Sequence, residues 1–295
     1  MKNYVITGST GHISKPIITG LVKAGNSVKV VTSSADKVKE IESLGATAVV
    51  GSLFDAAFVR SAFTGADAVY VMIPPIWQTV NWRASQREMA VNYAEAIRSL
   101  GIRHIVTLSS IGAHLPEGCG PVSGLYEFEQ MLNKIAGLNV KYLRPAFFYY
   151  NYFAQIGMIK QAGIMGGNYG TEGQKLPLAH TDDIARVALE ELLSLNFTGN
   201  SVRYILSDLR TAQEIVAVLG KAIGKQFPWV VFTDEQQKEG LLQAGLSETH
   251  TQGYVEMGAA MRSGKMQEEI LKQPLEKNGV RLEDFAKAFA AAYSA

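Results

Sequence analysis

A glycine loop near the start of the chain carries the clearest chemical signal in the sequence. Residues 7–14 read TGSTGHIS and follow a brief apolar run. Glycines at this spacing let the backbone turn sharply and approach a diphosphate, whose charge the N–H groups of a helix N-terminus would hold. A plain tight turn is the alternative, but the loop joins the first strand of a βαβ unit to its helix, as nucleotide binding requires. The residues expected to hold the diphosphate are Gly8, Thr10, Gly11, His12 and Ile13.

The end of the second predicted strand bears on which dinucleotide would bind. An Asp or Glu at this point would accept a hydrogen bond from the ribose 2′-hydroxyl of NAD and repel the 2′-phosphate of NADP. The strand ends instead with Thr32, Ser33 and Ser34. No arginine replaces the acid, which leaves the hydroxyls and Lys37 to meet a phosphate, while Asp36 fits a charge at a helix start. We expect Ser33 and Ser34 to face the adenosine ribose, with NADP preferred and NAD possible.

Short apolar runs alternate with amphipathic stretches and predict the elements that position this loop. Strands that are apolar along their length and separated by helices indicate a parallel sheet covered on both faces. Right-handed crossovers then favour an α/β fold with a doubly wound sheet. The predicted strands are residues 4–6, 28–31, 48–50, 68–72, 104–108 and 140–143, and the predicted helices run to residue 24 and over 37–44, 56–63, 85–100 and 126–136.

The alternation of predicted strands and helices becomes less regular beyond residue 150, where glycines between 163 and 173 mark loops. A helix over 182–193 and a strand over 202–206 are expected to return to the main sheet. The last sixty residues predict helices, with one face carrying Tyr254, Met257, Gly258 and Met261. We expect a dinucleotide-binding domain over residues 1–150 and a smaller, mainly helical substrate-binding lobe over residues 151–295, some of whose segments return to the main sheet.

Composition and charge exclude several classes of protein. Hydrophobic residues make up 47% of the 295-residue chain, which excludes a disordered chain. A net charge of +1 gives no overall field for nucleic acid or an anionic membrane. The single cysteine, Cys119, cannot form an intrachain disulfide, and neither a signal peptide nor a membrane span is expected. We therefore expect a cytoplasmic protein that binds a small-molecule substrate and no metal, and that could form a homodimer.

An ordered series of motifs resembles the NmrA-like branch of the atypical short-chain dehydrogenases, which includes quinone reductases and triphenylmethane-type reductases. The resemblance implies a Rossmann domain of the NADP type and a small C-terminal lobe that closes a substrate cleft. The matching motifs are the glycine loop, VTLSS at 106–110, EQML at 129–132 with GL at 137–138, LRPAFFYYN at 143–151 and HTDDIA at 180–185.

The chain departs from this family at the catalytic pair. Typical members use Tyr-x-x-x-Lys, in which the lysine activates the tyrosine as proton donor, but these positions fall on Val122 and Tyr126. Ser52 also stands where many relatives place an Asp beside the adenine. The chemistry of alcohols and ketones is therefore not expected. Tyr126, without an adjacent lysine, is one candidate for a catalytic proton donor, and His114 is a second, although an exposed loop histidine is the more common outcome.

Segments after the fourth, fifth and sixth predicted strands should form the rest of the site, because ligands of such folds lie at the carboxyl ends of the strands. The aromatic run 147–153 would either pack in the core or give a flat slot for a planar acceptor. The expected coenzyme contacts here are Ile73 and Pro74, and the expected substrate contacts are Pro75, His114, Phe148, Tyr149 and Asn151.

Two hypotheses of function follow, from different classes. The first is an NAD(P)H-dependent reductase of quinones or similar planar conjugated acceptors, since hydride transfer asks the protein mainly to position the coenzyme and exclude water. The second is a sensor that binds NAD(P) without chemistry, suggested by the missing Tyr-Lys pair. A nucleotide-sugar epimerase is disfavoured because it needs the tyrosine base. Cys119 is interpreted as incidental, and Asp182 with Asp183 as caps of a helix that begins at Ile184.

Overall fold

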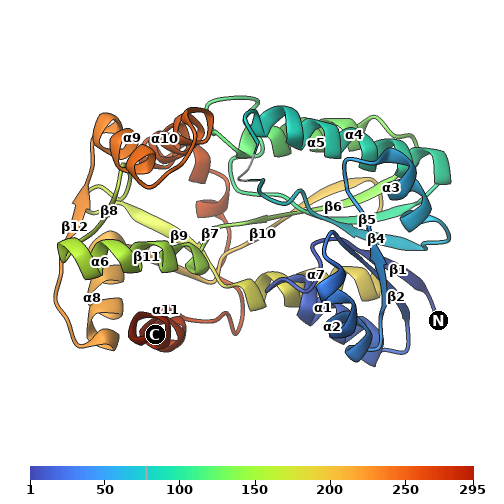
Figure 1. The fold of residues 1–295 in the computed structure, drawn as a ribbon, viewed down its shortest axis with the longest axis horizontal. Helices are drawn as coiled ribbons and strands as arrows, with labels where there is room; N and C mark the ends of the chain where they lie inside the picture. The colour runs from blue at the N-terminus through green and yellow to red at the C-terminus, as the bar shows by residue number, and fades with distance from the viewer. Residues whose placement is uncertain (77–78) are drawn as a thin grey trace. The chain divides into compact units, whose positions relative to one another are not determined.

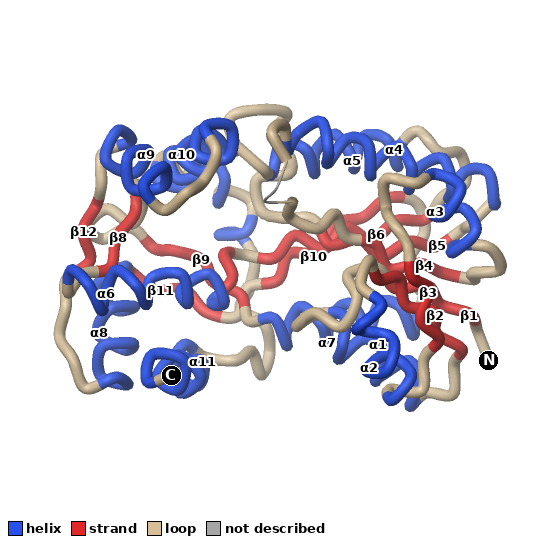
Figure 2. The backbone as a smooth tube through the Cα atoms, viewed as in Figure 1, coloured by secondary structure: helices blue, strands red, loops and turns tan. Residues whose placement is uncertain are grey.

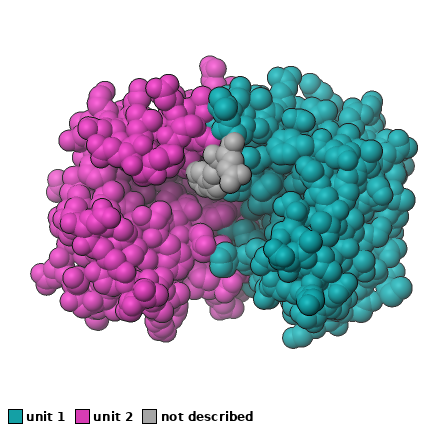
Figure 3. Space-filling model, in the orientation of Figure 1, with its two compact units in different colours: residues 1–110, 124–144, 184–203 teal, residues 111–123, 145–183, 204–295 magenta. Residues whose placement is uncertain are grey.

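The computed structural model describes residues 1–76 and 79–295 and groups them into two compact units (Figure 3). The first unit comprises residues 1–110, 124–144 and 184–203. The second comprises residues 111–123, 145–183 and 204–295. The chain passes from one unit to the other several times, so both contain segments from either side of residue 150.

A seven-stranded sheet, in the order β10-β6-β5-β4-β1-β2-β3, forms the centre of the first unit (Figure 1). The pairs β1–β2, β1–β4, β2–β3, β4–β5 and β5–β6 are all parallel. Because the strand order reverses at β1, the expected doubly wound sheet is confirmed. The strands are β1 (Asn3–Ile6), β2 (Ser27–Thr32), β3 (Thr47–Val50), β4 (Ala68–Val71), β5 (His104–Leu108), β6 (Asn139–Pro145) and β10 (Asn200–Ile205).

Helices cover both faces of this sheet. Figures 1 and 2 show α3, α4 and α5 on one face and α1, α2 and α7 on the other. Helix α4 begins three residues before the predicted start, because the Asn81 side chain accepts a hydrogen bond from the Ala84 N–H and caps it there. The helices are α1 (Ser14–Lys23), α2 (Val38–Ser43), α3 (Ala56–Phe63), α4 (Trp82–Leu100), α5 (Val122–Asn133) and α7 (Thr181–Ser194).

The core of the first unit lies between the sheet and these helices. Phe63 of α3 stacks on Tyr93 of α4, with ring centroids 5.8 Å apart, and Phe128 of α5 lies 5.9 Å from Tyr93. All three side chains are buried. Since each large aromatic side chain contributes roughly 1.5 to 3 kcal/mol on burial, this cluster fixes the helices on one face of the sheet.

The second unit combines a three-stranded sheet, a strand pair and helices. Helix α11 packs against α8, and on α10 Gly258 and Met261 are buried while Tyr254 and Met257 are half-buried. Among the described residues, no helix is both long enough and apolar enough to cross a membrane. The elements are β7 (Phe147–Phe148), β9 (Lys175–Ala179) and β11 (Asp208–Thr211), the pair β8 (Met165–Gly167) and β12 (Trp229–Val231), and helices α6 (Ile156–Ala162), α8 (Ala212–Ile223), α9 (Asp234–Gln243), α10 (Glu248–Arg262) and α11 (Leu282–Ser294).

Candidate functional site

The glycine loop turns between β1 and α1 with a backbone that only particular residues can adopt. Gly8 has φ of +90°, and a Cβ placed there would lie 2.7 Å from the Ser14 hydroxyl oxygen. That hydroxyl donates a hydrogen bond to the Thr7 carbonyl at 3.0 Å, and Ser14 is buried. Ser14 therefore ties the helix to the strand at the position where three-glycine loops have glycine.

Helix α1 presents N–H groups that no side chain caps. Its N-cap residue, Ile13, provides no hydrogen bond, and the first turn contains no acidic residue. Side-chain oxygens of Asp55, Thr211 and Thr233 cap α3, α8 and α9, whereas α2, α6 and α11, like α1, have no side-chain cap. The first N–H groups of a helix need acceptors from outside it and favour negative charge. The start of α1 therefore fits an anionic group such as a diphosphate, which would supply those acceptors.

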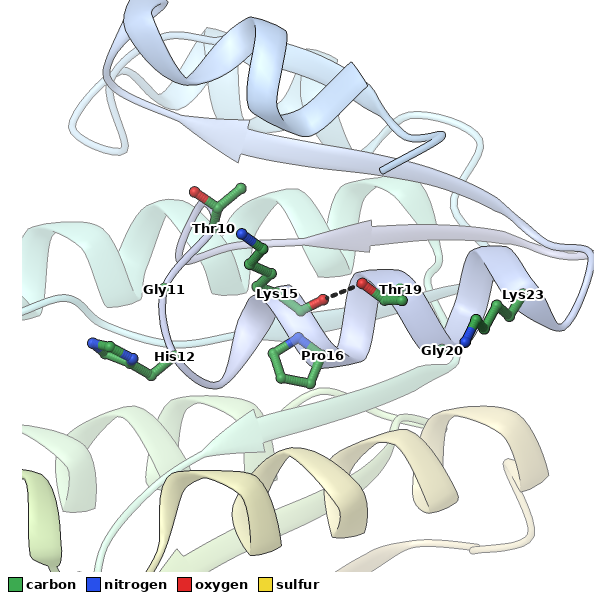
Figure 4. A pocket seen from close by; sticks show the side chains of 8 residues that line it. All are labelled: Thr10, Gly11, His12, Lys15, Pro16, Thr19, Gly20 and Lys23. Atoms are coloured by element: carbon green, nitrogen blue, oxygen red, sulfur yellow. Dashed lines mark hydrogen bonds between the residues drawn. The ribbon is translucent and has the colours of Figure 1, made fainter. Parts of the chain in front are cut away.

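A pocket of about 670 Å³ lies beside this loop and along the outer face of α1 (Figure 4). Figure 4 shows the Lys15 amine extending toward Thr10, whereas the exposed His12 projects away from both. The pocket thus has the amine of Lys15 on its wall next to the loop. It is lined by Thr10, Gly11, His12, Lys15, Pro16, Thr19, Gly20 and Lys23.

The end of β2 contacts the same loop. The Ser9 hydroxyl donates to the Thr32 hydroxyl at 3.1 Å, so the strand end and the loop are tied together. Ser33 is exposed, and the half-buried Ser34 accepts a hydrogen bond from the Asp36 N–H at 3.3 Å. Asp36 lies in the first turn of a short 3-10 helix over residues 35–37, the position in which a helix-start charge was expected.

An acidic side chain that the sequence analysis did not single out reaches this region. Glu40 of α2 accepts hydrogen bonds from the Thr10 hydroxyl at 2.8 Å, the Lys15 amine at 2.9 Å and the Lys37 amine at 3.0 Å. These hydrogen bonds, those from Lys15 and Lys37 above all, lower the pKa of the Glu40 carboxyl to about 2. Glu40 is therefore ionised at neutral pH and serves as counterion to both lysines.

The segment after β4 reaches the same edge of the sheet. The Met72 N–H donates to the Thr7 hydroxyl at 2.9 Å, which ties this segment to the start of the glycine loop. Ile73 is 8% exposed and belongs to the apolar core, whereas Pro74 is half-buried and Pro75 exposed. The two prolines are thus the more accessible of the three predicted contacts.

A buried polar network lies at the end of β5. The Ser109 hydroxyl donates to Glu129 Oε1 at 2.5 Å, and Arg144 of β6 donates to both oxygens of the same carboxylate, from Nε at 3.1 Å and Nη2 at 2.5 Å. The network therefore joins β5, α5 and β6. Tyr126 lies one helical turn before Glu129, is half-buried and, among residues 1–76 and 79–295, makes no hydrogen bond through its hydroxyl.

The predicted substrate contacts in the second unit differ in accessibility. Tyr149 is fully buried, stacks on Phe285 with centroids 5.3 Å apart, and donates its hydroxyl to the Val280 carbonyl at 3.2 Å. These are contacts of packing, the first of the two interpretations given to the aromatic run. His114 and Phe148 are half-buried, and Asn151 is exposed. Their roles toward a substrate remain predictions.

The adjacent Asp182 and Asp183 lie at a different place in their helix from the one predicted. Helix α7 begins at Thr181, so Asp182 and Asp183 lie within its first turn and do not precede it. The buried Asp183 carboxylate accepts hydrogen bonds from the Ser207 hydroxyl at 2.6 Å and the Val280 N–H at 2.8 Å. The interpretation as caps of a helix beginning at Ile184 was therefore wrong, and Asp183 instead links segments of the second unit.

The lone cysteine is not activated. Cys119 is buried, and burial together with the charge of Glu256 raises the pKa of its thiol to about 11. The reactive thiolate is thus disfavoured at neutral pH, which agrees with the interpretation of Cys119 as incidental.

Comparison with known proteins gives concordant matches. A model of a family described as NAD(P)H-binding matches residues 8–194. The chain is 25% identical over 293 residues to an NAD(P)H azoreductase of Xenophilus azovorans, covering 99% of each chain. An NADPH-dependent quinone oxidoreductase of Escherichia coli, solved with NADPH, aligns over 97% of this chain and 99% of its own, with a TM-score of 0.77 and 20% identity.

A regulatory protein shares the fold as well. NmrA, a negative transcriptional regulator solved with NADP, aligns over 98% of this chain and 91% of its own, with a TM-score of 0.69 and 13% identity. The resemblance inferred from the motifs is thus confirmed at the level of an NAD(P)H-binding family, and the chain shares its fold with NmrA and with the quinone oxidoreductase.

Proposed function

The chain belongs to the NAD(P)H-binding family, and from this premise we propose that it is an NAD(P)H-dependent reductase of quinones, azo compounds or similar planar conjugated acceptors. The observation that carries the proposal is the uncapped start of α1 beside a glycine loop whose Gly8 tolerates no side chain. The azoreductase and quinone reductase relatives, which match over nearly the whole chain, support the choice of acceptor.

The proposed coenzyme contacts all come from residues of the first unit. The backbone at Gly8, Gly11 and Ile13 would bind the diphosphate, and Ser33 with Ser34 would face the adenosine ribose. Thr10, His12, Ile73 and Pro74 complete the proposed set. When bound, the coenzyme supplies the hydride, so the protein need only orient it and exclude water.

The acceptor class follows from what the chain lacks at the catalytic pair. Val122 and Tyr126 occupy the positions of the Tyr-Lys pair, so no lysine activates a tyrosine for reduction of a simple ketone. A quinone that accepts hydride becomes a phenolate, which water or a weak acid can protonate. Tyr126 is the proposed donor of this proton, and Pro75, His114, Phe148 and Asn151 are the proposed substrate contacts, with Tyr149 supporting them from the core.

Turnover tests this proposal. Purified protein given NADPH and a small quinone or azo dye is expected to oxidise NADPH, measured as loss of absorbance by the reduced nicotinamide. Tyr126→Phe should lower kcat by about a hundredfold if its hydroxyl donates the proton, with KM little changed. Tight binding of NADPH with no turnover of any quinone, azo compound or dye in a broad panel would contradict the proposal.

A second candidate function is a sensor of the NAD(P) redox state without chemistry. The match to NmrA and the missing Tyr-Lys pair favour it. A sensor must bind the oxidised and reduced coenzymes with different affinities, because a ligand shifts an equilibrium only by its differential affinity. Calorimetric titration with NADP and NADPH, together with absence of turnover, would support this candidate; equal affinities would exclude it.

A further inference from the structure

Glu40 lies where the glycine loop, the first turn of α1 and the residues before α2 come together. Its carboxylate sits between the hydroxyl of Thr10 in the glycine loop and the amines of Lys15 on α1 and Lys37 before α2, at distances of 2.8, 2.9 and 3.0 Å. In folds of this type an acidic side chain that contacts the adenosine ribose normally belongs to the strand end itself. Here the strand ends in serines, and the acid comes from the following helix.

The cluster is reachable by solvent and by ligand. The side chains of Lys15 and Lys37 are 50% and 49% exposed, and that of Glu40 is 31% exposed. Lys15 and Thr10 also line the pocket beside the loop (Figure 4). Both amines can therefore turn toward an incoming anion without any change in the backbone.

Charge balance shows how Glu40 would act on an anion at this place. The two lysines carry two positive charges, which the phosphate of NADP, with about two negative charges, could neutralise alone. With Glu40 present the same site holds one negative charge too many. The Glu40 carboxylate also accepts one hydrogen bond from each amine, and a phosphate at this place would compete for these hydrogen bonds.

From this geometry we propose that Glu40 is the residue that sets coenzyme preference: its carboxylate stands in for the adenosine 2′-phosphate and thereby weakens binding of NADPH relative to NADH. The inference rests on the proposed binding of NAD(P)H by the glycine loop. NADH carries only a hydroxyl at this position, so its binding leaves the three contacts of Glu40 in place. The chain should consequently accept both coenzymes.

The substitution Glu40→Gln tests the proposal, and Glu42→Gln is its matched control. Both remove one carboxylate from α2, but Glu42 is exposed and lies two residues away on the same helix. Dissociation constants for NADPH and NADH are measured by fluorescence of the reduced nicotinamide. Adenosine 2′,5′-bisphosphate and adenosine 5′-monophosphate serve as competitors that isolate the 2′-phosphate.

We expect Glu40→Gln to tighten binding of NADPH and of the bisphosphate about tenfold, while binding of NADH and the monophosphate changes less than about twofold. Glu42→Gln should leave all four constants as in the wild type. Lys37→Gln should weaken NADPH binding, the opposite direction. Thermal unfolding of each variant checks that the fold is kept.

Two results would overturn the proposal. One is an unchanged ratio of NADPH to NADH affinity in Glu40→Gln. The other is a loss of NADH affinity in that variant, which would make Glu40 an acceptor for the ribose hydroxyl. Because the experiment measures binding and not turnover, a result against Glu40 leaves the reductase proposal intact. If the protein binds coenzyme but shows no turnover, the role of Glu40 can still be tested, because its test requires only dissociation constants.

Discussion

At the scale of single residues, two glutamates of α5 make ion pairs with arginines in very different surroundings. The side chains of Glu129 and Arg144 are 3% and 10% exposed, and Ser109 adds a further hydrogen bond. Those of Glu127 and Arg83 are 26% and 43% exposed. A buried charge is tolerated only while it is paired, whereas an exposed pair gains little over its separate hydration. Glu129 should therefore matter far more to stability than Glu127.

The substitution Glu129→Gln is expected to lower the free energy of unfolding by about 3 kcal/mol, because it removes the carboxylate charge that faces the buried Arg144 guanidinium. Glu127→Gln, the control on the same helix, should cost less than about 1 kcal/mol. Urea denaturation of both variants followed by circular dichroism measures the difference. Equal, small losses in the two variants would show that Arg144 is solvated in the native state.

The sequence could identify residues whose role follows from local spacing, but not those whose partners come from elsewhere in the fold. The glycine loop was recognisable because a strand, two glycines and a helix start follow one another directly. Glu40 was missed because Thr10 and Lys15 lie some thirty and twenty-five residues away. Asp183 was misread for the same reason, since its partner Ser207 lies on a distant segment.

At the scale of elements, the connection from β1 to α1 combines a rigid turn with an open helix end. Gly8 is required by its φ of +90°, but Gly11 has an ordinary backbone conformation, and a Cβ there would lie 3.2 Å from the Gly8 carbonyl oxygen. Gly11 is also exposed and lines the pocket. The fold therefore requires glycine at position 8, whereas a substitution at Gly11 chiefly tests contact with the ligand.

Gly11→Ala is expected to weaken NADPH binding about tenfold or more, because the added methyl group holds the diphosphate away from the loop, while the melting temperature falls by about 2 °C at most. Gly25→Ala is the control. Gly25 has φ of +79° with open space around it, so the variant should lose about 1 kcal/mol of stability and bind NADPH as the wild type does. Fluorescence titration and thermal unfolding measure both effects. Wild-type affinity in Gly11→Ala would place the diphosphate elsewhere.

Element types were predictable from the sequence where periodicity and length agreed. The six predicted strands and the helices between them all occur in the first unit. Boundaries were less accurate, because a helix end depends on individual capping contacts such as that of Asn81. Helix α5 ends at Asn133 and not at the expected residue 136, and it starts four residues earlier than expected. These shifts leave the order of the sheet unchanged.

At the scale of the whole molecule, the chain builds two compact units from interleaved segments. The return of β10 to the main sheet was predicted from its apolar run and is confirmed. The assignment of residues 111–123 to the second unit was not foreseen, because nothing in a short segment rich in glycine and proline indicates which core it joins. Such assignments depend on contacts between distant segments, which composition and periodicity do not encode.

The central claim is that the folded chain binds a nicotinamide dinucleotide at the start of α1. A thermal-shift titration tests it most directly, since a ligand that binds only the folded state must raise the melting temperature. At a hundred times the dissociation constant, NADPH should stabilise the protein by about 2.7 kcal/mol and raise its melting temperature by about 5 °C. In Gly11→Ala, whose affinity is expected to be about tenfold weaker, the same concentration should stabilise the protein by only about 1.4 kcal/mol and give about half this rise. A melting temperature that neither NADPH nor NADH moves, up to millimolar concentration, would contradict the account.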